Sequence, residues 1–161
     1  MMLAMARILA RLLVSPEFGL LSKRQRAAII ESLMLTAVRP GPISDADRRA
    51  LRLELMTLPW AWEVDRRAHD GLVDRRGLLL ARLEDPALLV PFGRALARVV
   101  GRGRLGELVY TMMAALVYAD GGSDHDAGAL EPLGLALGLR ASRAVEILDL
   151  LKDELVKAVV G

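Results

Sequence analysis

Apolar residues recur every three or four positions along most of the chain, with charged residues between them. This spacing predicts amphipathic α-helices, because positions three and four apart fall on one face of a helix. Glycine, proline and serine-acid pairs interrupt the pattern and mark helix ends. No segment predicts a β-strand, so we expect an all-α fold of about seven or eight helices. The predicted helices cover about residues 3–13, 22–39, 44–58, 60–83 (as one or two helices), 86–100, 105–119, 123–138 and 142–160.

Four predicted helix starts carry residues that favour N-capping. Ser22 and Ser142 are expected to be N-caps, and Asp85 is an N-cap residue followed by proline at the first helical position. Ser44 with Asp47 resembles a capping box in which Asp replaces Glu. The last helix is expected to bury one face made of Val145, Leu148, Leu151 and Leu155.

Two segments of the chain are similar at an offset of about 79 residues. Ser44-Asp45-Ala46-Asp47 aligns with Ser123-Asp124-His125-Asp126, and an apolar helix precedes each. The similarity predicts one domain over residues 1–161, built from two helix-loop-helix repeats related by a pseudo-twofold axis. The first repeat covers about 22–58 and the second about 104–139, with linking helices over about 59–101 and a C-terminal helix over about 142–160. The alternative is that two capped helices in a chain rich in Leu and Ala look alike by chance.

Hydrophobic residues make up 53% of the chain and its mean hydropathy is +0.33, which raises the question of a membrane span. The longest uncharged apolar run, over 108–119, is shorter than the roughly 20 residues that a span needs. Arg7 and Arg11 interrupt the apolar N-terminal segment, which argues against a signal peptide. We therefore expect a cytoplasmic protein. The first helix either packs on the core or lies on the inner face of the membrane.

Charge is distributed unevenly along the chain. Residues 1–104 carry 18 Lys and Arg against 11 Asp and Glu, a net charge of +7, whereas residues 105–161 carry 4 against 9, a net charge of −5. Asp-Arg-Arg occurs three times, at 47–49, 65–67 and 74–76. These pairs of charges favour a solvated, salt-bridged face. The alternative is a basic helical protein that associates with an anionic membrane surface, an acidic protein or nucleic acid. The scarcity of interleaved aromatic residues disfavours nucleic acid.

Catalytic motifs are missing from the sequence. The chain has no Cys and only two histidines, His69 and His125, too few for a zinc site or for a phosphohydrolase that uses His69-Asp70. Gly101-Arg102-Gly103-Arg104 lacks the Lys and hydroxyl residue of a phosphate-binding loop. We therefore predict a binding or scaffolding module with a protein partner. An enzyme would have to be a carboxylate-metal hydrolase. The large apolar fraction makes a homodimer plausible.

An acidic loop is the candidate binding site. Alternating acids can supply oxygen ligands for a hard divalent cation such as Ca²⁺ or Mg²⁺. The expected ligands are Asp120, Asp124 and Asp126, with Asp45 and Asp47 as further candidates from the first repeat. Glu131 stands at the twelfth position from Asp120, as in an EF-hand, but His125 stands where that loop requires glycine, so this is not an EF-hand. The alternative is that these acids only cap the helices on either side.

The run over residues 114–121, followed by an acidic cap and by Leu137-Gly138-Leu139, resembles the tellurite-resistance TerB-like family, the helical domain type of TerB and the DjlA N-terminus. Residues 34–58 resemble a degenerate copy with Pro40-Gly41-Pro42 in place of Ala-Asp-Gly. The resemblance implies paired helical hairpins, a divalent-cation-binding acidic surface at Asp120 and Asp126, and a role in stress response or membrane-associated assemblies without catalysis. The chain departs from the family pattern at residues 122–123, where the family usually has an apolar residue, and its loop is about one residue shorter.

Overall fold

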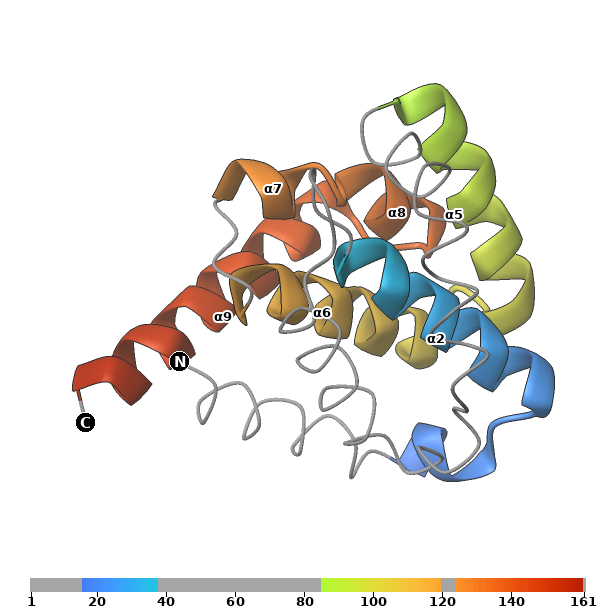
Figure 1. The fold of residues 1–161 in the computed structure, drawn as a ribbon, viewed down its shortest axis with the longest axis horizontal. Helices are drawn as coiled ribbons and strands as arrows, with labels where there is room; N and C mark the ends of the chain where they lie inside the picture. The colour runs from blue at the N-terminus through green and yellow to red at the C-terminus, as the bar shows by residue number, and fades with distance from the viewer. Residues whose placement is uncertain (1–15, 38–84, 120–123, 161) are drawn as a thin grey trace, which may run out of the picture.

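The computed structural model describes residues 16–37, 85–119 and 124–160, and within these ranges the chain is helical without a β-strand. The all-α class is thus confirmed for this part of the chain. The helices predicted over 3–13, 44–58 and 60–83 lie outside it, as does most of the first repeat. The elements are the 3-10 helix η1 (Pro16–Leu20) and the α-helices α2 (Lys23–Ala37), α5 (Pro86–Val100), α6 (Arg104–Ala119), α7 (Asp124–Gly128), α8 (Glu131–Ala136) and α9 (Ala141–Val160), shown in Figure 1.

The helix α6 is the centre of the described structure, and α2, α5, α7, α8, α9 and η1 all contact it (Figure 1). Its sequence is apolar on nearly every side, and such a helix is buried on nearly every side. α5 and α8 also pack closely on each other. The buried hydrophobic residues of α6 are Leu108, Val109, Tyr110, Met112, Met113, Ala114, Ala115, Val117 and Tyr118. Among the described helices, none combines the length and the apolar character needed to cross a membrane.

Two predicted helix starts are confirmed. The Ser22 hydroxyl accepts from the Gln25 amide N–H at 3.2 Å, and the Gln25 side chain accepts from the Ser22 N–H at 3.0 Å, which is a reciprocal capping box. Asp85 accepts from the Ala87 N–H at 2.9 Å ahead of Pro86. Both caps are local in sequence, and for that reason the residue pattern is sufficient to predict them.

The single helix predicted over 123–138 is wrong, because the structure has two short helices, α7 and α8, separated at Ala129 and Leu130. Pro132 supplies the physical reason. It has no N–H to donate to the carbonyl of Gly128, and a proline ring clashes with the carbonyl four residues earlier in a continuous helix. The chain instead turns, with the Leu130 N–H donating to Ala127 at 3.1 Å.

The predicted start and buried face of the last helix also need correction. α9 begins at Ala141, and the Ala144 N–H donates to the carbonyl of Arg140, so Ser142 lies inside the helix rather than at its N-cap. Val145 is 57% exposed. Of the predicted face, Leu151 is buried and Leu148 is partly buried against the core, whereas Ala144 and Ile147 are buried in place of Val145, so the packed face is rotated from the predicted one.

Gly138 ends α8 in a left-handed conformation, with φ of 88°. The Leu139 N–H donates to Gly134 at 3.0 Å and the Gly138 N–H donates to Leu135 at 3.1 Å, which is the Schellman arrangement. A Cβ at this glycine would lie 2.9 Å from Cβ of Arg102. Glycine is therefore required here both by the backbone and by the close approach of the link between α5 and α6. The Leu-Gly-Leu motif of the sequence is this helix end.

Candidate functional site

The predicted acidic loop is flanked by a polar cluster that joins three helices. Tyr118, near the end of α6, donates its hydroxyl proton to Oδ1 of Asp124 at 3.0 Å. The ammonium of Lys152 on α9 lies 2.9 Å from the same oxygen. The first residue of α7 is thereby tied to both the helix before it and the last helix of the chain.

The charges in this cluster are mutually stabilising. The hydrogen bond from Lys152, followed by the one from Tyr118, holds the pKa of Asp124 below its ordinary value of 3.8. Burial of the Tyr118 ring raises the pKa of its phenol, and the hydrogen bond to Asp124 raises it further. At neutral pH the carboxylate is therefore ionised and the phenol protonated. The Asp124 side chain is 69% exposed, so water screens the ion pair.

The predicted cation ligands differ in how the structure places them. Asp124 is described, and a metal ion approaching its Oδ1 has to compete with the Lys152 ammonium. Asp126 is exposed on α7, and Asp120 lies outside the described residues. The described part of the chain contains no group of three His, Asp or Glu side chains arranged to hold a metal ion. The cation site thus stays a prediction that depends on Asp120. The further candidate ligands Asp45 and Asp47 also lie outside the described residues and stay predictions.

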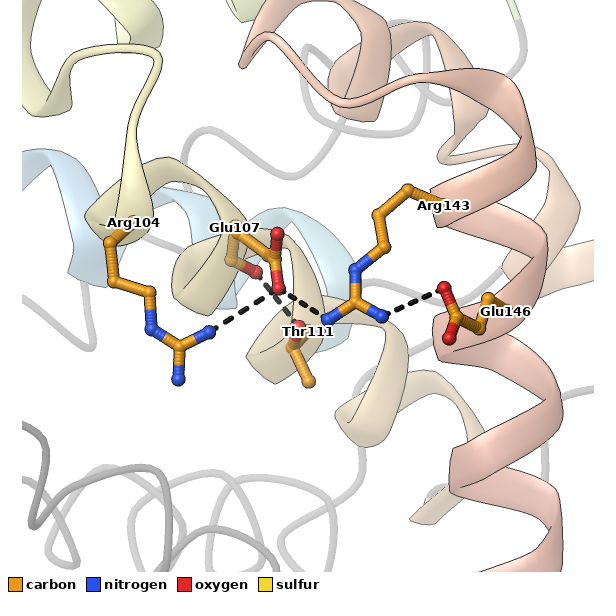
Figure 2. Close-up of polar contacts among 5 residues, drawn as sticks. All are labelled: Arg104, Glu107, Thr111, Arg143 and Glu146. Carbon is orange, nitrogen blue, oxygen red and sulfur yellow. Dashed lines mark hydrogen bonds and ion pairs between the residues drawn. The ribbon is translucent and has the colours of Figure 1, made fainter.

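A second polar cluster joins α9 to the start of α6, and sequence reasoning missed it (Figure 2). Arg143 donates from Nη2 to Oε1 of Glu107 at 2.7 Å, and its Nη1 lies 2.8 Å from Oε2 of Glu146. Arg104 adds a longer hydrogen bond of 3.3 Å to the same Glu107 oxygen. These two acids raise the pKa of Arg143, with Glu107 the larger contributor. One guanidinium therefore bridges carboxylates on two helices.

The sequence does contain a signal for this cluster. Glu107 is the only acid of α6 and stands in its first turn, where a negative charge is favoured by the helix dipole. An isolated acid in a helix that is otherwise buried requires a cationic partner. The pattern does not say which cation, because Arg143 lies 36 residues away in sequence.

Tyr110 is a third polar feature that the sequence did not reveal. The ring is fully buried, and its hydroxyl has no hydrogen-bond partner among the described residues. The ring packs on the backbone of Gly134, where a Cβ would lie 3.0 Å from Cε2 of Tyr110. Burial, together with the charge of Glu131, raises the pKa of Tyr110 to about 12. A neutral phenol of this kind is a packing element rather than a proton carrier at neutral pH.

The histidines add no further polar cluster to the described structure. His125 is exposed on α7, and His69 lies outside the described residues. Comparison of the chain with protein-family models, with curated proteins and with solved structures found no match. The TerB-like resemblance thus stays a prediction from the motif residues over 114–121 and 133–139 of the sequence.

Proposed function

We propose that the chain is a non-enzymatic interaction module of the TerB-like type that holds a protein partner against α9. The observation that carries the proposal is the exposure of large apolar side chains on this helix. Val145, Leu150 and Val156 are 57%, 53% and 61% exposed, while Ala144, Ile147 and Leu151 of the same helix are buried. When a partner covers exposed valine and leucine side chains, the free energy of binding becomes more favourable by roughly 25 cal/mol per Å² of apolar surface buried.

The polar clusters support this role because they fix α9 in place. Arg143 ties its first turns to Glu107, and Lys152 ties its middle to Asp124. The last turns of α9 extend beyond the other described helices in Figure 1. A helix held rigidly in this way presents its exposed side to a partner with little further ordering, which lowers the entropic cost of binding.

The proposed TerB-like architecture of two repeats is supported by the match between α2 and α6, which pack on each other. Ser32 donates its hydroxyl to the carbonyl of Ala28 at 2.8 Å. Thr111, which stands 79 residues later, donates to the carbonyl of Glu107 at the same distance. Ile29 and Leu108 are a second pair at this offset, and both are fully buried. The matched pairs favour a common origin for the first helix of each repeat.

To test the partner surface we would replace the exposed apolar residues by glutamine, as Val145→Gln, Leu150→Gln and Val156→Gln together. The matched control is Leu88→Gln with Leu135→Gln, which removes exposed leucines from α5 and α8. Partner proteins would be captured by cross-linking in the source cells and purified, and their affinity for the wild type and for each variant would be measured. Light scattering would detect binding of a second copy of this chain. Loss of affinity in the α9 variant alone supports the proposal. Equal affinity of all three proteins contradicts it.

We propose in addition that the acidic loop binds Ca²⁺ or Mg²⁺ weakly through Asp120, Asp124 and Asp126. A cation that binds only the folded state raises the unfolding temperature. The measurement is thermal unfolding in EDTA, Ca²⁺, Mg²⁺ and Mn²⁺ for the wild type, Asp120→Ala and Lys152→Ala. We expect a cation-dependent rise that Asp120→Ala abolishes and that Lys152→Ala enlarges, because its ammonium no longer competes for Asp124. Absence of any cation effect in all three proteins would leave the acids as helix caps only.

A further inference from the structure

Four basic residues gather at one edge of the described structure, where α2 begins and α5 ends. We call Lys23, Arg24, Arg98 and Arg102 the basic edge. Gln25 in the first turn of α2 donates its side-chain amide to the carbonyl of Val99 in the last turn of α5, at 3.3 Å. This contact joins the two helix ends that carry the cations, although these ends are about 75 residues apart in sequence. Figure 1 shows the two helix ends on the same side of the molecule.

The cations of the basic edge are exposed and make no ion pair with the described acids. The acids on η1, on α2 and at the start of α5 are Glu17, Glu31 and Asp85, and the neighbouring helices α6 and α8 carry Glu107 and Glu131. Arg104, which follows the link after Arg102, is bound to Glu107 and is not counted. The described residues therefore leave the positive charge of this edge uncompensated, in contrast to the bridged arginine on α9.

Lys23 and Arg24 do not stabilise the helix that carries them. They stand in the first turn of α2, which has no acid, and a positive charge at this end opposes the helix dipole. Arrangements that maximise helix stability put Asp or Glu there. Because these cations oppose the dipole of their own helix, an anionic partner beyond the described residues is the better explanation of their placement.

Leu20 identifies the class of anionic partner. It ends η1 three residues before Lys23 and is 91% exposed, the largest exposure among the exposed large apolar side chains of the described residues. A phospholipid surface accommodates both features, because phosphates attract the cations while the interface takes up an apolar side chain. Nucleic acid offers phosphates but no comparable apolar environment for leucine.

We propose that the basic edge, together with Leu20, docks this protein on the surface of an anionic phospholipid membrane. This inference goes beyond the protein-interaction role of α9 and does not depend on it, since the two surfaces share no residue. Each Lys or Arg near an anionic surface strengthens binding by about fivefold. Removal of two cations is thus expected to weaken binding about 25-fold at low salt.

The experiment is co-sedimentation of the full chain with vesicles of phosphatidylcholine containing about 30% phosphatidylserine. Vesicles of pure phosphatidylcholine and an ionic strength raised to about 0.5 M are the comparisons, because salt screens the attraction. The variants are Lys23→Gln with Arg24→Gln, Arg98→Gln with Arg102→Gln, and Leu20→Gln alone. The matched control, Lys157→Glu, lowers the net charge by the same amount as either pair but lies on α9, away from this edge.

We expect the wild type and Lys157→Glu to bind the anionic vesicles alike, and both pair variants and Leu20→Gln to bind more weakly. Thermal unfolding separates lost binding from misfolding, because Lys23→Gln with Arg24→Gln should unfold no earlier than the wild type. Binding that is equal on neutral vesicles, or unchanged in both pair variants, overturns the proposal. So does tighter binding to duplex DNA than to vesicles when the same pair variants abolish it, since the partner is then nucleic acid.

Discussion

Arg143 on α9 and Glu107 on α6 are joined by an ion-paired hydrogen bond of 2.7 Å, across 36 residues of sequence (Figure 2). Glu107 is one-quarter exposed and Arg143 about two-fifths exposed. The pair is thus partly shielded from water, unlike the neighbouring contact to Glu146, whose side chain is 60% exposed. We infer that this bond fixes the start of the last helix on the core.

Breaking this bond should destabilise the fold modestly. We expect Arg143→Met to lower the free energy of unfolding by about 1 kcal/mol, because a partly exposed ion pair is screened and contributes little more. Urea unfolding of Arg143→Met, Glu107→Gln and the double variant measures the coupling between the two side chains. Glu146→Gln is the matched control and should lower the free energy of unfolding by less than Arg143→Met does. Additive effects of the two single changes would show that the bond is unimportant.

The two tyrosines of the chain allow one substitution to be tested in two environments. Tyr110→Phe removes a buried hydroxyl that has no described partner, and we expect stability to be unchanged or higher by up to about 1 kcal/mol. Tyr118→Phe removes the hydrogen bond to Asp124 and should cost about 1 kcal/mol. Chemical unfolding of both variants measures the two changes in the free energy of unfolding. A loss at Tyr110 larger than at Tyr118 would mean that the buried hydroxyl has a partner.

Alkaline titration should reveal the burial of both phenols. Their pKa values are raised, that of Tyr110 to about 12, whereas an unfolded tyrosine ionises near its ordinary value of 10.0. The folded state therefore holds its phenolic protons longer, and its stability falls as pH rises from about 10 through 12. Ultraviolet absorbance of tyrosinate should stay low in the folded protein at pH 10 to 11 and appear on unfolding. Ionisation near pH 10 without unfolding would contradict the buried geometry.

Acid titration tests the contact between Asp124 and Lys152. The pKa of Asp124 is lowered in the folded state, so its contribution to stability is complete above its ordinary value of 3.8 and is lost as pH falls through the folded value. We expect Asp124→Asn to be less stable than the wild type at neutral pH, and the difference to shrink below about pH 4. Unfolding temperatures measured across this range provide the check. A difference that does not vary with pH would assign the effect to packing.

Gly138→Ala should be among the more damaging changes to the second hairpin. Alanine at a positive φ costs about 1–2 kcal/mol, and its methyl group would in addition collide with Arg102. Gly128→Ala, where nothing lies within 4 Å of an added Cβ, is the matched control and should be well tolerated. Unfolding free energies of the two variants give the comparison. Equal stability would mean that the Schellman turn does not hold α8 and α9 together.

The features that sequence reasoning predicted correctly are local ones. The caps at Ser22 and Asp85 involve residues within three positions of each other, and so their geometry follows from residue type alone. The rotated face of α9 depends instead on how the helix lies against α6 and α8. Val145 and Ala144 are adjacent, and only that packing decides which of them is buried. A periodicity that tolerates both choices cannot make the distinction.

The candidate site was predictable only in part for the same reason. The acids of the loop stand out in the sequence, but Lys152 follows Asp124 by 28 residues and carries no mark that pairs them. The basic edge combines residues of α2 and α5 that only the contact between Gln25 and Val99 brings together. The uneven charge of the chain indicated a basic region. It did not indicate which cations share a surface.

The most direct test of the α9 surface is hydrogen-deuterium exchange of the chain alone and bound to its purified partner. Backbone amides covered or stabilised by a partner exchange more slowly, and the protected peptides locate the surface. We predict that protection concentrates in peptides that contain Val145, Leu150 and Val156, with little change in α5. Protection confined to other segments, with α9 exchanging as fast in the complex as in the free chain, would contradict the proposed role of this helix.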